Sequence, residues 1–168
     1  MPQFGIRYAE GVKILPILTP ADIVATATYT SYVDLNMVNW ATFLVSLGNV
    51  ASTDSTGEVV ITVEASTAGT SNATEGAVAF SYRLSAAVNT DTMGAIAAAT
   101  AAGGAAINNT ADNTVVVIDV DPSVVAATAD RRFVRLLITP TAEITATVVG
   151  VVAVLEHRYP GNAIPSST

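Results

Sequence analysis

Short segments in which apolar and polar residues alternate are the strongest constraint on how this chain can fold. Between residues 42 and 47 the odd positions are apolar and alternate with Thr42, Leu44 and Ser46. Residues 58–65 repeat this alternation, and residues 77–85 show it most clearly. Because successive side chains of a strand point to opposite faces of a sheet, the period of two predicts strands with one face in a core.

The rest of the chain extends this prediction. Further strands are expected within residues 25–35, 114–120, 133–139 and 143–157. A helical turn is expected after Asp121, because an acidic residue caps a helix well and Pro122 suits its first position. The alanine-rich residues 95–106 fit a short helix, a strand of small residues or a loop equally well.

About eight short strands predict an all-β fold, an antiparallel β-sandwich with a jelly-roll-like topology. An immunoglobulin-like topology is the alternative. The predicted division of the chain is an extended N-terminal arm at residues 1–24, the sandwich at residues 25–159 and a C-terminal tail at residues 160–168.

The arm is the candidate partner-binding segment. Pro16 and Pro20 bias the residues before them toward extended conformations, and prolines suit edge strands. An exposed apolar arm would be adhesive, so it either packs along its own sheet or reaches onto a partner. The candidate partner-binding residues are Val12, Ile14, Leu15, Pro16, Ile17 and Leu18.

Composition favours an assembly over a membrane protein. Hydrophobic residues make up 51% of the 168 residues, and charged residues make up 12%, where roughly a quarter is usual in soluble domains. The longest weakly polar run, residues 145–155, is far shorter than the ~20 residues that span a bilayer. We therefore expect neighbouring subunits to cover much of the surface, which reduces the need for charge.

Charge disfavours two further partner classes. The formal net charge is -7, and a protein that grips a phosphate backbone needs a basic face. Nucleic acid and anionic membrane surfaces are therefore not expected partners. Residues 1–11 lack the apolar core of a secretion signal, which predicts synthesis and assembly in a cytoplasm.

Residues that could support catalysis are sparse. The chain has no cysteine and one histidine, His157, and no Gly-x-Ser-x-Gly elbow accompanies it. His157 is better interpreted as a strand-end or interface residue. Gly103-Gly104 lacks the sequence context of a phosphate-binding loop. The sequence predicts no enzyme, no catalytic residue and no cofactor.

The acidic residues offer two weak alternatives. Asp119 and Asp121, with Asp130 nearby, could supply oxygen ligands to Ca²⁺, but the calcium-loop pattern is absent. Asp121 is better explained as a helix cap, and Asp130 as an ion-pair partner of a following arginine. Glu58 and Glu64 are expected on a solvated strand face. No metal site is predicted.

Two further features need an interpretation. Arg131, Arg132 and Arg135 form the one basic cluster, which fits salt bridges to a neighbouring subunit or to an acidic loop better than nucleic-acid binding. Trp40 is the only tryptophan, and it begins an apolar strand. Packing in the core is its simplest role, and stacking against a ligand is the alternative.

The chain contains, in this order, the segments Lys13–Pro20, Tyr32–Leu35, Val63–Thr67, Phe80–Ser85, Ile118–Pro122, Phe133–Arg135 and Arg158–Pro160. The order of these segments resembles small structural proteins of tailed-bacteriophage head gene clusters, namely capsid decoration (cement) proteins. The resemblance covers most of the chain, and its motifs are architectural rather than catalytic.

The resemblance implies a virion protein that binds the outside of an icosahedral shell, commonly as a homotrimer, and clamps adjacent capsomers. Its partners would be the major capsid protein and further copies of itself. Two alternatives remain open: a tail or head-to-tail connector component, and a carbohydrate-binding sandwich. In the latter, the stacking residues would be Trp40, Tyr29, Tyr32 and Tyr82.

Overall fold

The computed structural model describes residues 12–24, 26–70, 75–87, 90, 92–128 and 130–157. Nearly all regular elements are strands, and every strand pairing is antiparallel. The predicted all-β antiparallel sandwich is therefore confirmed, and the jelly-roll topology stays a prediction. The predictions for residues 1–11 and for the tail at residues 160–168 lie outside the described residues.

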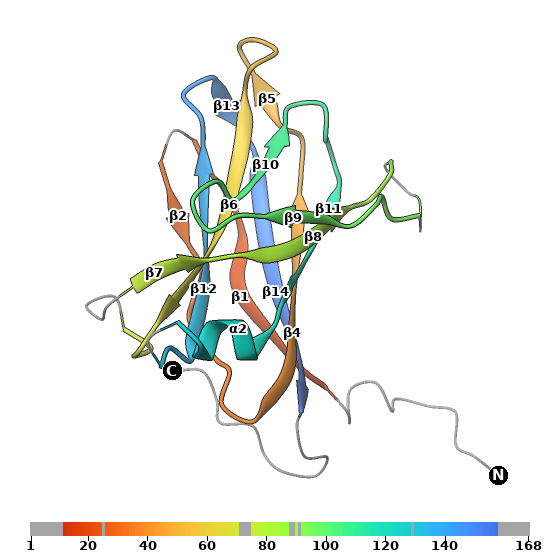
Figure 1. Ribbon diagram of the computed structural model, residues 1–168. Helices are drawn as coiled ribbons and strands as arrows, with labels where there is room; N and C mark the ends of the chain where they lie inside the picture. The colour runs from red at the N-terminus through yellow and green to blue at the C-terminus, as the bar shows by residue number, and fades with distance from the viewer. Residues whose placement is uncertain are drawn as a thin grey trace, which may run out of the picture.

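Sheet A has the strand order β1-β14-β4-β11-β8-β9 (Figure 1). Its strands are β1 (Val12–Asp22), β4 (Val38–Leu47), β8 (Phe80–Leu84), β9 (Ala97–Ala99), β11 (Val115–Val120) and β14 (Val148–His157). The arm predicted at residues 1–24 thus contains an edge strand of this sheet. Val12 pairs with Glu156 and Asp22 pairs with Val148, so β1 follows β14 along its whole length.

Sheet B has the order β10-β6-β12-β2, with β3 also on β12 and β7 also on β6. Its strands are β2 (Thr28–Tyr29), β3 (Val33–Asp34), β6 (Glu58–Ser66), β7 (Glu75–Val78), β10 (Ala105–Asn108) and β12 (Phe133–Pro140). A third, two-stranded sheet joins β5 (Ala51–Ser52) to β13 (Ile144–Ala146). It lies at the end of the molecule opposite the helix (Figure 1).

The core lies between the inward faces of sheets A and B. Phe43 and Val45 of β4 are fully buried, as are Ile61 of β6 and Leu136 of β12. The neighbouring even-numbered residues of β4 face outward, so the alternation predicted for residues 42–47 is confirmed. Burial of these apolar side chains supplies most of the driving force for folding.

The segment at residues 77–85, predicted to be a single strand, changes sheets at Ala79. Val63 of sheet B pairs with Val78, whereas Asp119 of sheet A pairs with Ser81. The chain crosses between the sheets again in the alanine-rich region, where β9 and β10 are joined by a turn at residues 101–104. Gly104 has φ +61° there, and a Cβ would lie 2.6 Å from the carbonyl oxygen of Ile61, so this turn requires glycine.

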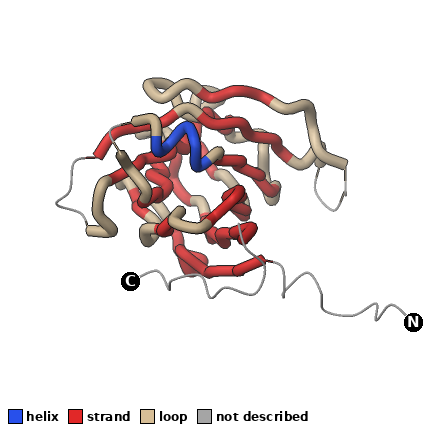
Figure 2. Tube along the Cα trace, turned by 60° about the horizontal axis from the view of Figure 1, so that its bottom comes forward, coloured by secondary structure: helices blue, strands red, loops and turns tan. Residues whose placement is uncertain are grey.

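Helix α2 (Pro122–Ala126) confirms the helical turn predicted after Asp121. The Asp121 side chain accepts a hydrogen bond from the Ser123 amide at 2.8 Å, and Pro122 occupies the first turn. Figure 2 shows this short helix on the surface, next to strands and the loops that join them. No helix in the described ranges is long and apolar enough to cross a membrane.

Candidate functional site

The outer face of sheet A carries a broad set of apolar side chains. In register, Pro16 of β1 lies beside Val152 of β14, Val152 beside Leu44 of β4, and Leu44 beside Val117 of β11. One row of apolar residues therefore crosses four strands. We call this surface the sheet A face; its residues are Ile14, Pro16, Leu44, Val115, Val117, Val148, Val152 and Val154.

These residues are exposed to an unusual degree for aliphatic side chains on adjacent strands. Ile14 is 49% exposed, Val148 47% and Leu44 36%. Charged residues lie at the margins, where Glu156 pairs with Trp40 and Arg83 pairs with Val117. Contiguous apolar surface with a polar rim is typical of protein interaction sites.

The predicted arm residues divide between the core and the sheet A face. Ile17 is buried, and Leu15 and Leu18 pack against the core. Ile14 and Pro16 point outward and are exposed. Over its described residues 12–24, the arm packs along its own sheet, which is one of the two alternatives. Among these residues, the outward side chains of Ile14 and Pro16 remain accessible to a partner.

The prediction that Trp40 packs in the core is wrong. Its side chain is 41% exposed and belongs to the outward side of β4. The pairing of β4 with β14 shifts register between Glu156 and His157, so Val38 and Ala41 take the buried positions around it. The alternation of β4 already placed residue 40 with Thr42 and Leu44, which was the signal for its position.

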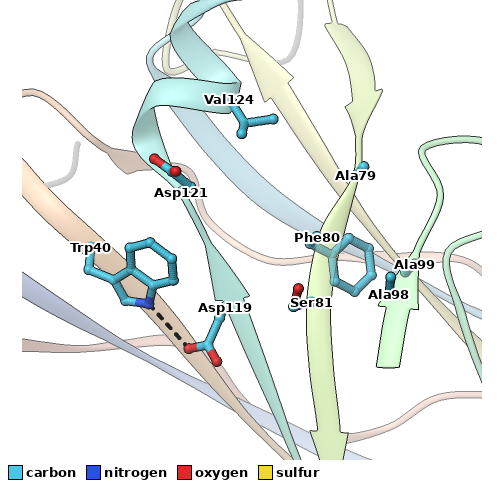
Figure 3. Close-up of a pocket in the computed structure, with 9 residues that line it drawn as sticks. All are labelled: Trp40, Ala79, Phe80, Ser81, Ala98, Ala99, Asp119, Asp121 and Val124. Atoms are coloured by element: carbon cyan, nitrogen blue, oxygen red, sulfur yellow. Dashed lines mark hydrogen bonds between the residues drawn. The ribbon is translucent and has the colours of Figure 1, made fainter. Parts of the chain in front are cut away.

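Trp40 lines a pocket at the α2 end of the sheet A face (Figure 3). The pocket has a volume of about 270 Å³ and lies between β4, β11, β8, β9 and α2. We call it the Trp40 pocket. Its lining residues are Trp40, Ala79, Phe80, Ser81, Ala98, Ala99, Asp119, Asp121 and Val124.

Asp119 anchors the wall of this pocket. Its Oδ1 accepts a hydrogen bond from the hydroxyl of Thr42 at 2.8 Å and one from the Trp40 indole Nε1 at 3.4 Å. Asp121 contributes a second carboxylate, whose Oδ1 caps α2. In each carboxylate one oxygen is thus held by the fold, while Oδ2 makes no hydrogen bond with any described residue.

The calcium alternative is weakened by this arrangement. Asp119 and Asp121 line one pocket. Asp130 follows α2 in the sequence, is exposed, and does not line this pocket. Within the described ranges, no three acidic or histidine residues gather as metal ligands do. Asp130 also forms no ion pair with the described arginines, so the pairing predicted for it is wrong.

The outer face of sheet B holds an ionic and aromatic cluster around Arg135. The guanidinium of Arg135 lies 2.9 Å from Glu64 and 2.6 Å from Glu75. The rings of Tyr29 and Tyr32 cover it, with centroids 4.0 Å and 4.8 Å from its Cζ. We call these residues the Arg135 cluster. Glu64, predicted on a solvated face, is instead half-buried in this cluster.

Tyr32 completes the cluster. Its hydroxyl donates a hydrogen bond to Glu75, and the residue is 7% exposed. Burial, together with this hydrogen bond, raises the pKa of Tyr32 from its ordinary value of 10.0 to about 12. The phenol is therefore held in its neutral form, in which it can donate to the carboxylate.

The other two arginines also have contacts within the chain. Arg132 pairs with Asp34 at 2.9 Å and lies over the Phe133 ring. The guanidinium of Arg131 lies against Gly76, so closely that a Cβ at residue 76 would be 2.3 Å from it. The sequence predicted salt bridges from this cluster to a neighbouring subunit or an acidic loop. Arg132 and Arg135 instead pair with carboxylates on strands of their own chain, Asp34 of β3, Glu64 of β6 and Glu75 of β7.

The four residues proposed for carbohydrate stacking do not form one site. Trp40 lies on the sheet A face, and Tyr29 and Tyr32 lie in the Arg135 cluster of sheet B. Tyr82 packs against the core beside Phe80, with ring centroids 6.2 Å apart. His157 is the last residue of β14, opposite Val38, and its side chain lies outside the described part of the chain.

Comparison with known proteins gives no relative. No protein-family model matches this chain, and no curated protein or solved structure matches it either.

Proposed function

We propose that this chain is a structural virion protein, a capsid decoration or cement protein of a tailed bacteriophage. It would bind the outside of the icosahedral head as a homotrimer and stabilise the shell by bridging capsomers. The observation that carries this proposal is the sheet A face, a contiguous apolar surface on a chain with few charges. The resemblance in segment order supports the same assignment.

The sheet A face supports binding to protein rather than to a small polar ligand. Its central row, formed by Pro16, Val152, Leu44 and Val117, is apolar across four strands. Covering such a surface gains about 25 cal/mol for each Å² of apolar area removed from water. Rigid strands also present it in one conformation, which limits the entropy lost on binding.

The charge of the chain supports a position on the outer surface of a shell. With a net charge of -7, the protein would be repelled by packaged DNA. Many copies on one particle would act together, so each individual contact could remain weak. The major capsid protein and further copies of this chain are the proposed partners.

Binding to assembled shells tests the proposal directly. Purified protein is mixed with heads lacking it, sedimented, and quantified in the pellet, while light scattering measures its oligomeric state in solution. Leu44→Glu/Val152→Glu should reduce shell binding at least tenfold. The matched control Thr62→Glu/Thr139→Glu places the same charges on the outer side of sheet B and should bind as the wild type does.

The result that would overturn the proposal is a stable monomer with no affinity for such shells. Equal binding by the sheet A variant and the wild type would show that another surface makes the contact. A connector would use the same kind of surface, but it would be present in few copies per particle. Densitometry of purified particles separates the two roles.

A further inference from the structure

The Trp40 pocket differs from the rest of the sheet A face because it combines an aromatic ring with carboxylates. One wall is the half-exposed indole of Trp40, and Asp119 and Asp121 contribute carboxylates beside it (Figure 3). The opposite wall is formed by small residues, including Ala79 between β7 and β8 and Ala98 of β9. The pocket therefore has an acidic, aromatic side and an apolar side.

The hydrogen-bonding groups of the pocket are almost all acceptors. The indole N–H already donates to Asp119 Oδ1, and the Asp121 Oδ1 already accepts from the Ser123 amide. The Oδ2 atoms of both carboxylates form no hydrogen bond with a described residue, and Ser81 supplies the one other polar side chain among the described lining residues. Among the described residues, no lysine or arginine lines the pocket. Such a site suits a ligand that carries several donors and a positive charge.

The aromatic and apolar walls of the pocket narrow the choice of ligand further. Tryptophan is the best partner among the aromatic residues for a lysine or arginine head group placed over its face. The aliphatic stem of such a side chain would pack on Ala98, Ala99 and Val124, as long cationic side chains do on apolar surface. A sugar would also stack on an indole, and its hydroxyls would donate to the carboxylates, but it would leave both negative charges without a counter-charge, which a cationic side chain supplies.

We propose that the Trp40 pocket binds a lysine or arginine side chain of the partner protein that covers the sheet A face. The proposal rests on the function proposed above, because it assigns the chemistry of that partner. Asp119 and Ser81 lie in the same outward row as Ile14, Val154 and Thr42. A partner seated on the apolar face therefore reaches the pocket without a separate binding site.

Trp40 is the only tryptophan in the chain, so its fluorescence reports on the pocket alone. The probe is Nα-acetyl-arginine methylamide, titrated into the full-length protein at constant ionic strength. The matched control probe is the citrulline analogue, which has nearly the same shape but no charge. We expect a saturable change with the arginine compound, with a dissociation constant in the millimolar range, and at least tenfold weaker binding of the citrulline compound.

Charge-removing variants locate the response. Asp119→Asn/Asp121→Asn keeps acceptors for the hydrogen bonds from Thr42 and Ser123 but removes both charges, and it should weaken the arginine probe at least tenfold. Asp54→Asn/Glu143→Gln removes two charges elsewhere and should bind as the wild type does. Ala98→Leu fills the pocket and should abolish the response. Thermal unfolding of each variant verifies that it is folded.

Several outcomes would overturn the proposal. Equal binding of the arginine and citrulline probes would show that charge is not recognised. Saturation by methyl glucoside, without a response to arginine, would assign the pocket to sugars. If Asp119→Asn/Asp121→Asn bound shells as tightly as the wild type does, the role of the pocket in partner binding would be rejected, and the proposed function would stand. Probe binding by a protein with no shell affinity would reject the function and leave the pocket.

Discussion

On the outer face of sheet B, Arg135 lies between two carboxylates and two tyrosine rings of its own chain. On the outer face of sheet A, Ile14 and Leu44 remain exposed beside other aliphatic side chains. Both faces belong to one sandwich and share one core. The difference teaches where a partner is needed, because one face satisfies its side chains internally and the other leaves apolar surface in water.

The largest expected effect comes from opening the Arg135 cluster. Arg135→Met should destabilise the fold by about 3 kcal/mol, because Glu64 and Glu75 would keep half-buried charges without a cation. Urea denaturation measures the change. Arg135→Met/Glu64→Gln/Glu75→Gln removes all three charges and should recover most of the loss. A triple variant no more stable than the single one would show that packing, not charge, holds this face together.

Tyr32→Phe tests the neutral part of the same cluster. It removes the hydroxyl that donates to Glu75 and should cost about 1.5 kcal/mol at pH 7. Because the pKa of Tyr32 is raised to about 12, its contribution is fully present below the unfolded value near pH 10. It is lost as the pH rises toward 12, because the unfolded chain releases the proton first.

The measurement is the free energy of unfolding between pH 8 and pH 12. Wild type should lose stability across the upper part of this range, and Tyr32→Phe should lose less. Tyr29→Phe, which keeps its ring over Arg135 and removes an exposed hydroxyl, is the control and should follow the wild type. If all three proteins lost the same free energy of unfolding at alkaline pH, Tyr32 would not be the source of the loss.

These contacts also show where sequence reasoning ends. Alternation assigned the inward and outward sides of β4 and β6 correctly, because one face of each strand is buried. The alternation could not reveal the change of sheet at Ala79. Val78 and Phe80 are both buried, as they would be in one continuous strand. Arg135 meets Tyr29 and Tyr32 only through the pairing of β12 with distant segments, which no local pattern encodes.

The wrong prediction that Trp40 packs in the core has a different cause. Its position in the alternation of β4 placed it outside with Thr42 and Leu44, and its hydrophobic, aromatic character suggested the core. The alternation was the better guide, because strand geometry fixes the direction of a side chain regardless of its type. The pocket around Trp40 needed four other elements of the fold and could not be predicted locally.

A smaller effect is expected from the ion pair between Arg132 and Asp34. Arg132→Gln removes the contact with Asp34, but the Arg132 side chain is 54% exposed. The Asp34 carboxylate is only 9% exposed, but it keeps the hydrogen bond from the Asn36 amide, and solvent reaches the pair from the arginine side. Urea denaturation should therefore give a loss near the upper end of the about 0.2–1 kcal/mol that exposed pairs contribute, below that of Arg135→Met. A loss equal to that of Arg135→Met would mean that exposure does not separate the two arginines.

The smallest effect on folding, and the clearest difference between the two faces, should come from Leu44→Thr. Leu44 faces outward and threonine suits a strand, so the free energy of unfolding should change by less than about 0.5 kcal/mol. Its neighbour Val45 is fully buried, so Val45→Thr should cost about 1–3 kcal/mol by burying a hydroxyl without a partner. Shell binding should reverse this order, with Leu44→Thr weakened and folded Val45→Thr retaining affinity. If Leu44→Thr lost folding stability and kept full affinity, the sheet A face would be structural, and the contrast with the Arg135 cluster would disappear.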